Sequence, residues 1–127
     1  MPQAPVYAVD VAVVSEYLPD DSSPNAGRHA FAYHVTLTNT GTVAARLLRR
    51  HWIITDGSGH VEEVRGDGVV GQQPLLAPGE QYRYTSGAIL GTPVGSMRGS
   101  YRMLAADGHP FDAVIPVFTL AMPQALN

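Results

Sequence analysis

The chain has 127 residues, of which 45% are apolar and 15% charged, and its formal net charge is −3. This length and composition predict one folded domain over residues 1–127 and argue against a disordered chain. The acidic balance argues against a nucleic-acid partner or an anionic lipid surface, because both require a strongly basic protein face.

Two residue types are missing, and their absence excludes several kinds of chemistry. All eight basic residues are arginines, and the chain has no cysteine. Lysine Schiff bases, thiol catalysis, disulfides and cysteine-ligated metals are therefore excluded. No stretch approaches the roughly 20 apolar residues of a membrane span, and the N-terminal sequence lacks the basic and apolar segments of a secretory leader. We expect a soluble cytoplasmic protein with no membrane span.

The first two expected strands alternate between apolar and other side chains. In Val6 to Tyr17 the core face carries Tyr7, Val9, Val11 and Val13, and in His29 to Thr38 it carries Phe31, Tyr33, Val35 and Leu37. Between them, Leu18 to Gly27 is rich in turn residues and predicts a surface loop with neither helix nor strand. Asp20 and Asp21 in this loop are interpreted as solvated carboxylates rather than a cation site, because a hard cation needs several more oxygen ligands.

The third expected strand, Ala45 to Asp56, contains the single tryptophan of the chain. Trp52 is predicted to pack in the core rather than to serve as a ligand platform. Alternation is blurred at residues 49–51, which predicts a rim position or a β-bulge. A turn at residues 56–59 leads to a short strand of mixed polarity, His60 to Arg65, which we expect at a sheet edge.

Residues Gly66 to Tyr101 contain the densest turn chemistry, and we expect a ligand or partner to dock there. Further strands are expected at Glu80 to Ser86, Ser96 to Ala105 and Phe111 to Leu120. Asp107-Gly108 is a strong hairpin signal. No segment shows the sustained 3.6-residue period of an amphipathic helix. The pattern predicts an all-β fold: an immunoglobulin-like or fibronectin type III-like antiparallel β-sandwich of about seven strands.

Gly66, Gly68 and Gly71 form a GxGxxG motif after an expected strand. Backbone N–H groups of such a loop, with Arg65 nearby, can hold a phosphate group. The dinucleotide-binding version must open a helix, however, and Pro74 follows too soon for one. We therefore favour a tight crossing between sheets, keep phosphate binding as an alternative function, and expect no cofactor.

Residue types that form catalytic and metal sites are present, but they do not occur at the spacing of any known site. The five histidines lie on separate elements or opposite strand faces, so their spacing matches no set of metal ligands. His60 and Glu62 share a face, and divalent-metal binding assembled across strands stays open as a second alternative. The nucleophile elbow G-x-S-x-G is absent. We predict no catalytic residues and no dedicated metal site, and hence a protein that is not an enzyme.

Four arginines are the first candidates for a protein interface, because arginine is enriched at the centres of interfaces. They are Arg49, Arg50, Arg98 and Arg102. The composition does not identify the partner, which we expect to be another protein. Association with a second copy of the chain also stays open.

A series of short motifs resembles the bacterial ApaG family. The motifs cover nearly the whole chain and are Arg50-His51-Trp52, Asp56-Gly57, Gly66 to Gly71, Gln73-Pro74, Pro78-Gly79-Glu80, Tyr84-Thr85-Ser86-Gly87, Thr92-Pro93, Gly95-Ser96-Met97 with Gly99, and Phe111 to Leu120. A set of fixed motifs of this length is specific, whereas the GxGxxG motif alone is not.

The resemblance implies a fibronectin type III-like sandwich and a role in protein interaction. The family is linked to cobalt resistance and magnesium efflux, and similar domains occur at the C-terminal ends of some F-box proteins and of a polymerase-delta interacting protein. The family offers no established catalytic residues. It offers Gly66, Gly68 and Gly71 as a proposed pyrophosphate-binding element.

Overall fold

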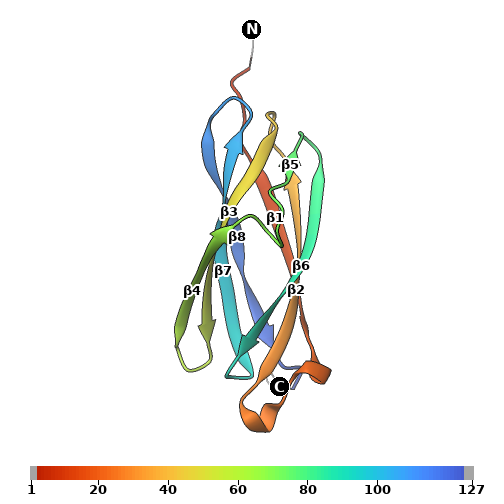
Figure 1. Ribbon diagram of the computed structural model, residues 1–127, viewed down its shortest axis with the longest axis vertical. Coiled ribbons are helices and arrows are strands. Elements are labelled where there is room, and N and C mark those ends of the chain that lie inside the picture. The colour runs from red at the N-terminus through yellow and green to blue at the C-terminus, as the bar shows by residue number, and fades with distance from the viewer. Residues whose placement is uncertain (1–2, 125–127) are drawn as a thin grey trace.

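A computed structural model describes residues 3–124 and contains eight β-strands. In chain order the strands are β1 (Val9–Tyr17), β2 (His29–Asn39), β3 (Ala45–Asp56), β4 (Val61–Asp67), β5 (Leu75–Leu76), β6 (Gln81–Leu90), β7 (Val94–Ala105) and β8 (Pro110–Ala121). All pairings are antiparallel, and the strands form two sheets that face each other (Figure 1). The predicted all-β antiparallel sandwich is therefore confirmed, with eight strands in place of seven.

The two sheets differ in size and in the way their edges meet. One sheet has three strands in the order β1-β2-β6, and the other has the order β4-β3-β7-β8 with the short β5 also paired to β3. On one side, β1 packs beside β8, and the Ser15 hydroxyl donates a hydrogen bond to the Thr119 carbonyl oxygen (2.9 Å). On the other side, the edge strands β4 and β6 are not hydrogen-bonded to each other.

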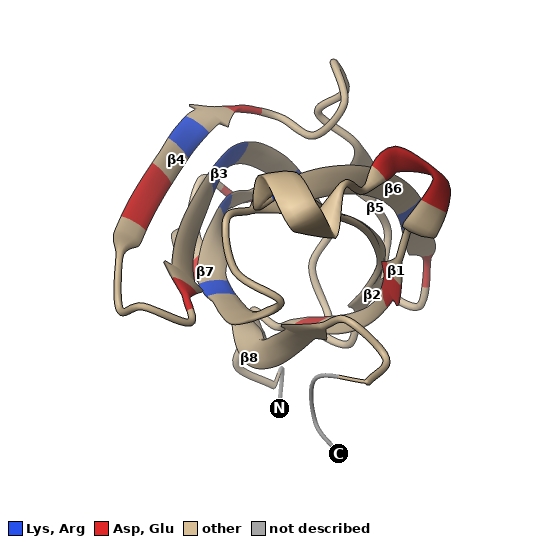
Figure 2. Cartoon of the chain, turned by 90° about the horizontal axis from the view of Figure 1, so that it is seen from below, with Lys and Arg blue, Asp and Glu red and all other residues tan. Residues whose placement is uncertain are grey.

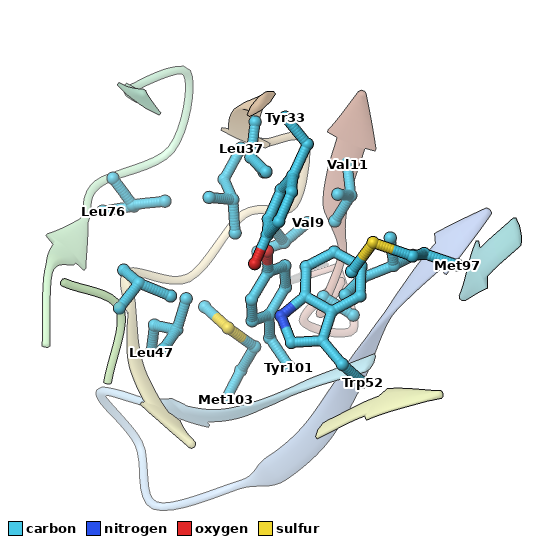
Figure 3. Close-up of a cluster of buried hydrophobic side chains, with 14 of the residues drawn as sticks. Val9, Val11, Tyr33, Leu37, Leu47, Trp52, Leu76, Met97, Tyr101 and Met103 are labelled. Carbon is cyan, nitrogen blue, oxygen red and sulfur yellow. The ribbon is translucent and has the colours of Figure 1, made fainter. Parts of the chain in front are cut away.

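The core fills the space between the sheets and is made of the inward-facing side chains of both (Figure 3). Trp52 is only 2% exposed and meets the ring of Tyr33 edge-on at 5.1 Å, so its predicted core position is confirmed. The predicted core face of the second strand is confirmed, because its whole set is buried. That of the first strand is confirmed in part: Val9 and Val11 are buried and Val13 packs against the core, whereas Tyr7 precedes β1 and is only half-buried.

Three sequence-based expectations need correction. The loop at residues 18–27 does contain helix, in two single-turn 3₁₀ segments at Pro19–Asp21 and Pro24–Ala26, because a proline presets the backbone at the start of each. The eighth strand, β5, was missed because it has only two residues between prolines. Strand β6 runs four residues beyond the predicted end, to Leu90, where small residues hide the alternation.

Two β-bulges shape the larger sheet. The pairing of β3 with β7 shifts register between Leu47 and Arg49, which confirms the irregularity predicted for this strand. The pairing of β7 with β8 shifts between Met97 and Gly99. A bulge changes which side of the sheet the following residues face, so the first one decides where the arginines of β3 point.

Candidate functional site

Four arginines lie on the outer surface of the larger sheet, on three neighbouring strands. We call Arg49, Arg65, Arg98 and Arg102 the arginine face. Strand register gathers them: His51 pairs with both Arg65 and Ser100, Arg49 pairs with Arg102, and Ile53 pairs with Arg98. All four are exposed, and the blue segments of β3, β4 and β7 lie on the same side of the molecule in Figure 2. Half of the arginines of an acidic chain are therefore concentrated on one sheet surface.

A shallow groove of about 580 Å³ runs along this surface. Its lining is Arg49, Arg50, His51, Arg65, Gly66, Asp67, Ser100, Arg102 and Asp112. The groove combines predicted interface residues with Arg65 and Gly66 of the predicted phosphate loop. Arg98 is on the same surface but does not line the groove.

The charges in the groove are only partly balanced. Arg102 donates to the Asp112 carboxylate (3.2 Å), whereas Arg49 has no ion-pair partner among residues 3–124. In the strand pairing, Arg49 is directly opposite Arg102 on β7 and Asp67 on β4, although no carboxylate oxygen of the described residues comes within 4 Å of its guanidinium group. Like charges directly opposite each other destabilise a sheet, so this pair carries an unfavourable interaction that an added anion would relieve.

A small charged network borders the groove on β4. The Glu63 carboxylate contacts His51 Nε2 at 2.8 Å and Arg65 Nη2 at 3.5 Å. The hydrogen bond from His51, helped by the charge of Arg65, lowers the pKa of Glu63, which therefore stays ionised. This carboxylate partly offsets Arg65, as Asp112 partly offsets Arg102. Arg49 is thus the outward-facing arginine of the groove that has no ion-pair partner among residues 3–124.

Arg50 points to the opposite side of β3, toward the interior. Its Nη1 donates to the carbonyl oxygens of Asp67 (2.9 Å) and Gly68 (3.0 Å). Its Nε and Nη2 groups have no acceptor within the described part of the chain, although an arginine has five N–H donors. Arg50 also lies near the hydroxyl groups of Tyr84 and Tyr101, which bond to each other and whose pKa values are raised by burial.

The glycine motif begins in the last two residues of β4 and continues into a tight turn, and no helix begins there within residues 3–124. Val69 and Gln72 exchange two backbone hydrogen bonds (2.8 and 2.9 Å), and the Gly68 N–H donates to the Leu48 carbonyl oxygen (2.8 Å). Three of the backbone N–H groups in this segment are thus already used within the chain. Only Arg65 and Gly66, from the predicted phosphate-binding set, line the groove.

The local structure explains why glycine occupies these positions of the motif. A side chain on Gly66 would meet the Arg50 guanidinium at 2.6 Å, and one on Gly68 would collide with the Gln72 carbonyl oxygen. Gly68 and Gly71 have φ of 63° and 76°, in the left-handed region that favours glycine. The motif therefore shapes the turn and leaves room for Arg50.

Val70 is an unusual residue at the tip of this turn. It has φ of 48°, and it is the only described residue other than glycine with a positive φ. A β-branched side chain in this region is a conformational outlier. With Gly71, it forms the two central residues of a type I′ turn, in which asparagine followed by glycine is preferred. Val70 is 65% exposed, so no core packing accounts for the strain.

The histidines do not gather into a metal site. His29 is buried and His34 is exposed on the opposite side of β2, while His109 stacks on Tyr7 at 4.0 Å. Among residues 3–124, no group of three or more histidines and carboxylates lies in an arrangement that would hold a metal ion. The described part of the chain also contains no helix with the length and apolarity that a membrane crossing requires.

Sequence reasoning missed four residues of the groove: His51, Asp67, Ser100 and Asp112. It also grouped Arg49 with Arg50, which the structure places on opposite sides of β3. The alternation counted back from Trp52 would have placed Arg50 inside, as Trp52 is. The pairing of Arg49 with Arg102 depends on strand register, which no local pattern gives.

Comparisons with known proteins show extensive similarity. A family model of the ApaG domain matches residues 19–105. The chain is 57% identical over 127 residues to Protein ApaG of Aromatoleum aromaticum, covering 100% of both chains. It is 62% identical over 121 residues to Protein ApaG of Pseudomonas aeruginosa, covering 95% of this chain and 96% of the relative. The crystal structure of an ApaA protein from Bordetella pertussis matches with a TM-score of 0.92 at 52% identity, covering 94% of this chain and 98% of that one.

Proposed function

The chain belongs to the ApaG domain family, and on that basis we propose that it is a non-enzymatic binding module that recognises a protein partner through the arginine face. Interface centres are enriched in arginine, and a rigid sheet presents its side chains without a large ordering cost. The same face has an apolar neighbour, because Val114 pairs with Ser100 and is 69% exposed. Arginines beside an exposed valine suit a partner surface that is acidic and partly apolar.

One observation carries this proposal: the unpaired Arg49 opposite Arg102. Both residues line the same groove, and of the two only Arg102 has a carboxylate within 4 Å among residues 3–124. A carboxylate from a partner can accept two parallel hydrogen bonds from a guanidinium group. Binding would add a strong contact and would also relieve the repulsion between the two arginines. The partner residue expected at this position is an aspartate or a glutamate.

Affinity capture from a lysate tests the proposal with two matched variants. Arg49→Glu reverses a charge on the arginine face, and Arg83→Glu makes the same change on the exposed face of β6 in the other sheet. We expect wild type and Arg83→Glu to retain a common protein that Arg49→Glu loses. Mass spectrometry of the captured fractions identifies that protein.

A stability measurement separates lost binding from misfolding. Arg49→Glu places a carboxylate opposite Arg102 on one side and opposite Asp67 on the other, so it creates one attractive and one repulsive cross-strand pair. Its thermal midpoint should therefore stay close to that of wild type while the partner is lost. Identical captured proteins for all three chains, or no specific protein for wild type, would contradict the proposal.

A phosphate-bearing ligand in the same groove is the second candidate function. The observation in its favour is that Arg65 and Gly66 line the groove beside Arg49 and Arg102. Guanidinium groups rather than the backbone amides of the loop would make the main contacts, because the amides of Gly68, Val69 and Gln72 are already hydrogen-bonded within the chain. Titration with inorganic pyrophosphate should shift the backbone resonance of Gly66. A spectrum that stays unchanged at millimolar pyrophosphate excludes this candidate.

We propose that any link to cobalt resistance or magnesium efflux is indirect and acts through the protein partner. The arginine face suits an acidic partner better than a cation, since four of its side chains are positively charged. Direct cobalt binding would appear as shifts of histidine resonances during a cobalt titration. Flat titration curves for the histidines agree with an indirect effect.

A further inference from the structure

The free edge of β6 differs from the other sheet edges in having little protection. Strand β4 carries four charged residues, β1 packs beside β8, and β8 contains two prolines and a register shift. Strand β6 pairs with β2 without a register shift and has no charged residue between Tyr84 and Leu90 (Figure 1). Natural proteins usually protect a long, uncharged edge by charge, proline, a bulge or a covering segment. This edge therefore has the properties of a strand-docking site.

Two hollows flank this edge, one on each side of the strand. The inner one has a volume of about 310 Å³ and lies in the opening between β4 and β6. Its lining includes Trp52, Ile54 and Val64. The outer one, of about 420 Å³, lies over the end of the smaller sheet and contains Leu18 and Ala30. Residues 87–89 of β6 line both hollows. Side chains of an added strand point alternately to the two sides, so each hollow can receive every second side chain.

The inner side of the edge also has opposite charges at its two ends. Arg50 lies near Tyr84 at one end and has N–H groups without an acceptor in the described residues. Glu62 shares a small hollow with Ile89 and Leu90 at the other end. A complementary segment would place an acidic side chain near Arg50 and a basic one near Glu62, with apolar residues between them.

We propose that the β6 edge from Tyr84 to Leu90 binds an extended segment of a partner protein as an added β-strand. The segment has apolar residues at every second position and carries an acidic residue at the end that meets Arg50. Backbone hydrogen bonds to β6 supply the pairing, while the two hollows and the terminal charges select the sequence. The site shares none of the four arginines of the arginine face, although Arg50 lines both the groove on that face and the inner hollow. Its test uses substitutions on β6 and is independent of the function proposed above.

Selection of a random display library of short peptides on the full chain tests this proposal. Enriched peptides should have apolar residues at every second position and should share an acidic residue toward one end. A synthetic copy of the best peptide should slow hydrogen exchange of amides in β6. Replacing its acidic residue with asparagine should weaken binding about tenfold, the effect of losing one charged contact.

Two protein variants locate the binding edge. Ile89→Lys places a charge on the free edge, at a side chain that is 55% exposed, and should weaken peptide binding about tenfold or more. Val14→Lys is the control, because Val14 is also an exposed β-branched residue (67%), on β1 at the other edge of the same sheet. We expect Val14→Lys to bind the peptide as wild type does.

Several outcomes would overturn the proposal. These are a library without enriched peptides, protection of an edge other than β6, or equal weakening by Ile89→Lys and Val14→Lys. A wild-type dimer that Ile89→Lys converts to a monomer would show that a second copy of the chain covers the edge instead. Peptide binding lost in Arg49→Glu but kept in Ile89→Lys would assign the peptides to the arginine face, which would support the proposed function and contradict this inference.

Discussion

Arg49 and Arg50 are adjacent in the sequence but face opposite sides of β3, and this separation gives them different roles. Arg49 is exposed beside Arg102 on the outer surface. Arg50 is half-buried, and its guanidinium group fits against Gly66, where a side chain would collide with it. The sequence predicted that this segment is irregular, but the bulge that turns Arg49 outward became visible only with the pairing of β3 and β7.

Val70 provides a test of backbone strain at a single residue. A non-glycine residue in the left-handed region costs about 1 to 2 kcal/mol, and asparagine tolerates this region better than valine. Val70→Asn also creates the preferred asparagine–glycine pair of a type I′ turn. We therefore expect Val70→Asn to raise the free energy of unfolding by about 1 kcal/mol, measured by urea denaturation.

The matched control is Val114→Asn, which replaces an equally exposed valine (69%) in the extended backbone of β8. This change should lower stability slightly, because asparagine is disfavoured in strands. Equal destabilisation by both variants would show that the turn does not strain Val70.

Tyr7 and Asp107 give a prediction about pH. The Tyr7 hydroxyl donates to the Asp107 carboxylate at 2.5 Å. This hydrogen bond lowers the pKa of Asp107 below its ordinary value of 3.8 and raises the pKa of Tyr7 above 10.0. The stabilisation from Asp107 is thus present above pH 3.8 and is lost as the pH falls through the lowered pKa. The stabilisation from Tyr7 is present below pH 10.0 and is lost as the pH rises through the raised pKa of Tyr7.

Tyr7→Phe should therefore raise the pKa of Asp107 toward 3.8 in an NMR titration of the side-chain carboxyl groups. Asp56 is an internal control, because a hydrogen bond from the Ser58 hydroxyl lowers its pKa and Tyr7 is not involved. An Asp107 carboxyl that titrates identically in wild type and Tyr7→Phe would contradict this assignment.

The strands and turns show where local patterns are sufficient and where they are not. Alternation identified seven of the eight strands, because burial of one face requires apolar residues at every second position. It failed at β5, which is too short to show a period, and at the end of β6, where Gly87 and Ala88 hide it. The GxGxxG motif also shows the limit of local patterns, because the same glycines are compatible with a phosphate-binding loop and with a tight turn. Only the backbone conformation distinguishes the two.

Two glycines at the sheet surface should respond differently to the same substitution. A side chain on Gly99 would collide with the backbone carbonyl oxygen of His51, so β3 and β7 must separate to accommodate it. A side chain on Gly66 meets only the end of the flexible Arg50 side chain. We expect Gly99→Ala to cost about 3 kcal/mol and Gly66→Ala about 1 kcal/mol of unfolding free energy, measured by urea denaturation. Equal costs would mean that the close approach of β3 to β7 is not rigid.

The whole molecule is a sandwich that is closed on one side by β1 and β8 and open on the other between β4 and β6. The sandwich itself could be predicted, because it follows from alternation and turn chemistry along the chain. The groove could not, because it combines residues from four strands whose register depends on contacts distant in sequence. The cytoplasmic location and the binding of a protein partner stay predictions.

Photo-crosslinking in cells tests most directly whether the arginine face binds a protein partner. A photoreactive amino acid replaces Ser100, which lies on β7 directly opposite His51 of β3 and is part of the groove. A control replaces the exposed Ala12 on β1, in the other sheet. We predict a discrete crosslinked protein at Ser100 that is absent at Ala12 and disappears when Arg49→Glu is added. The same crosslinks at both positions, or none at Ser100, would contradict the account.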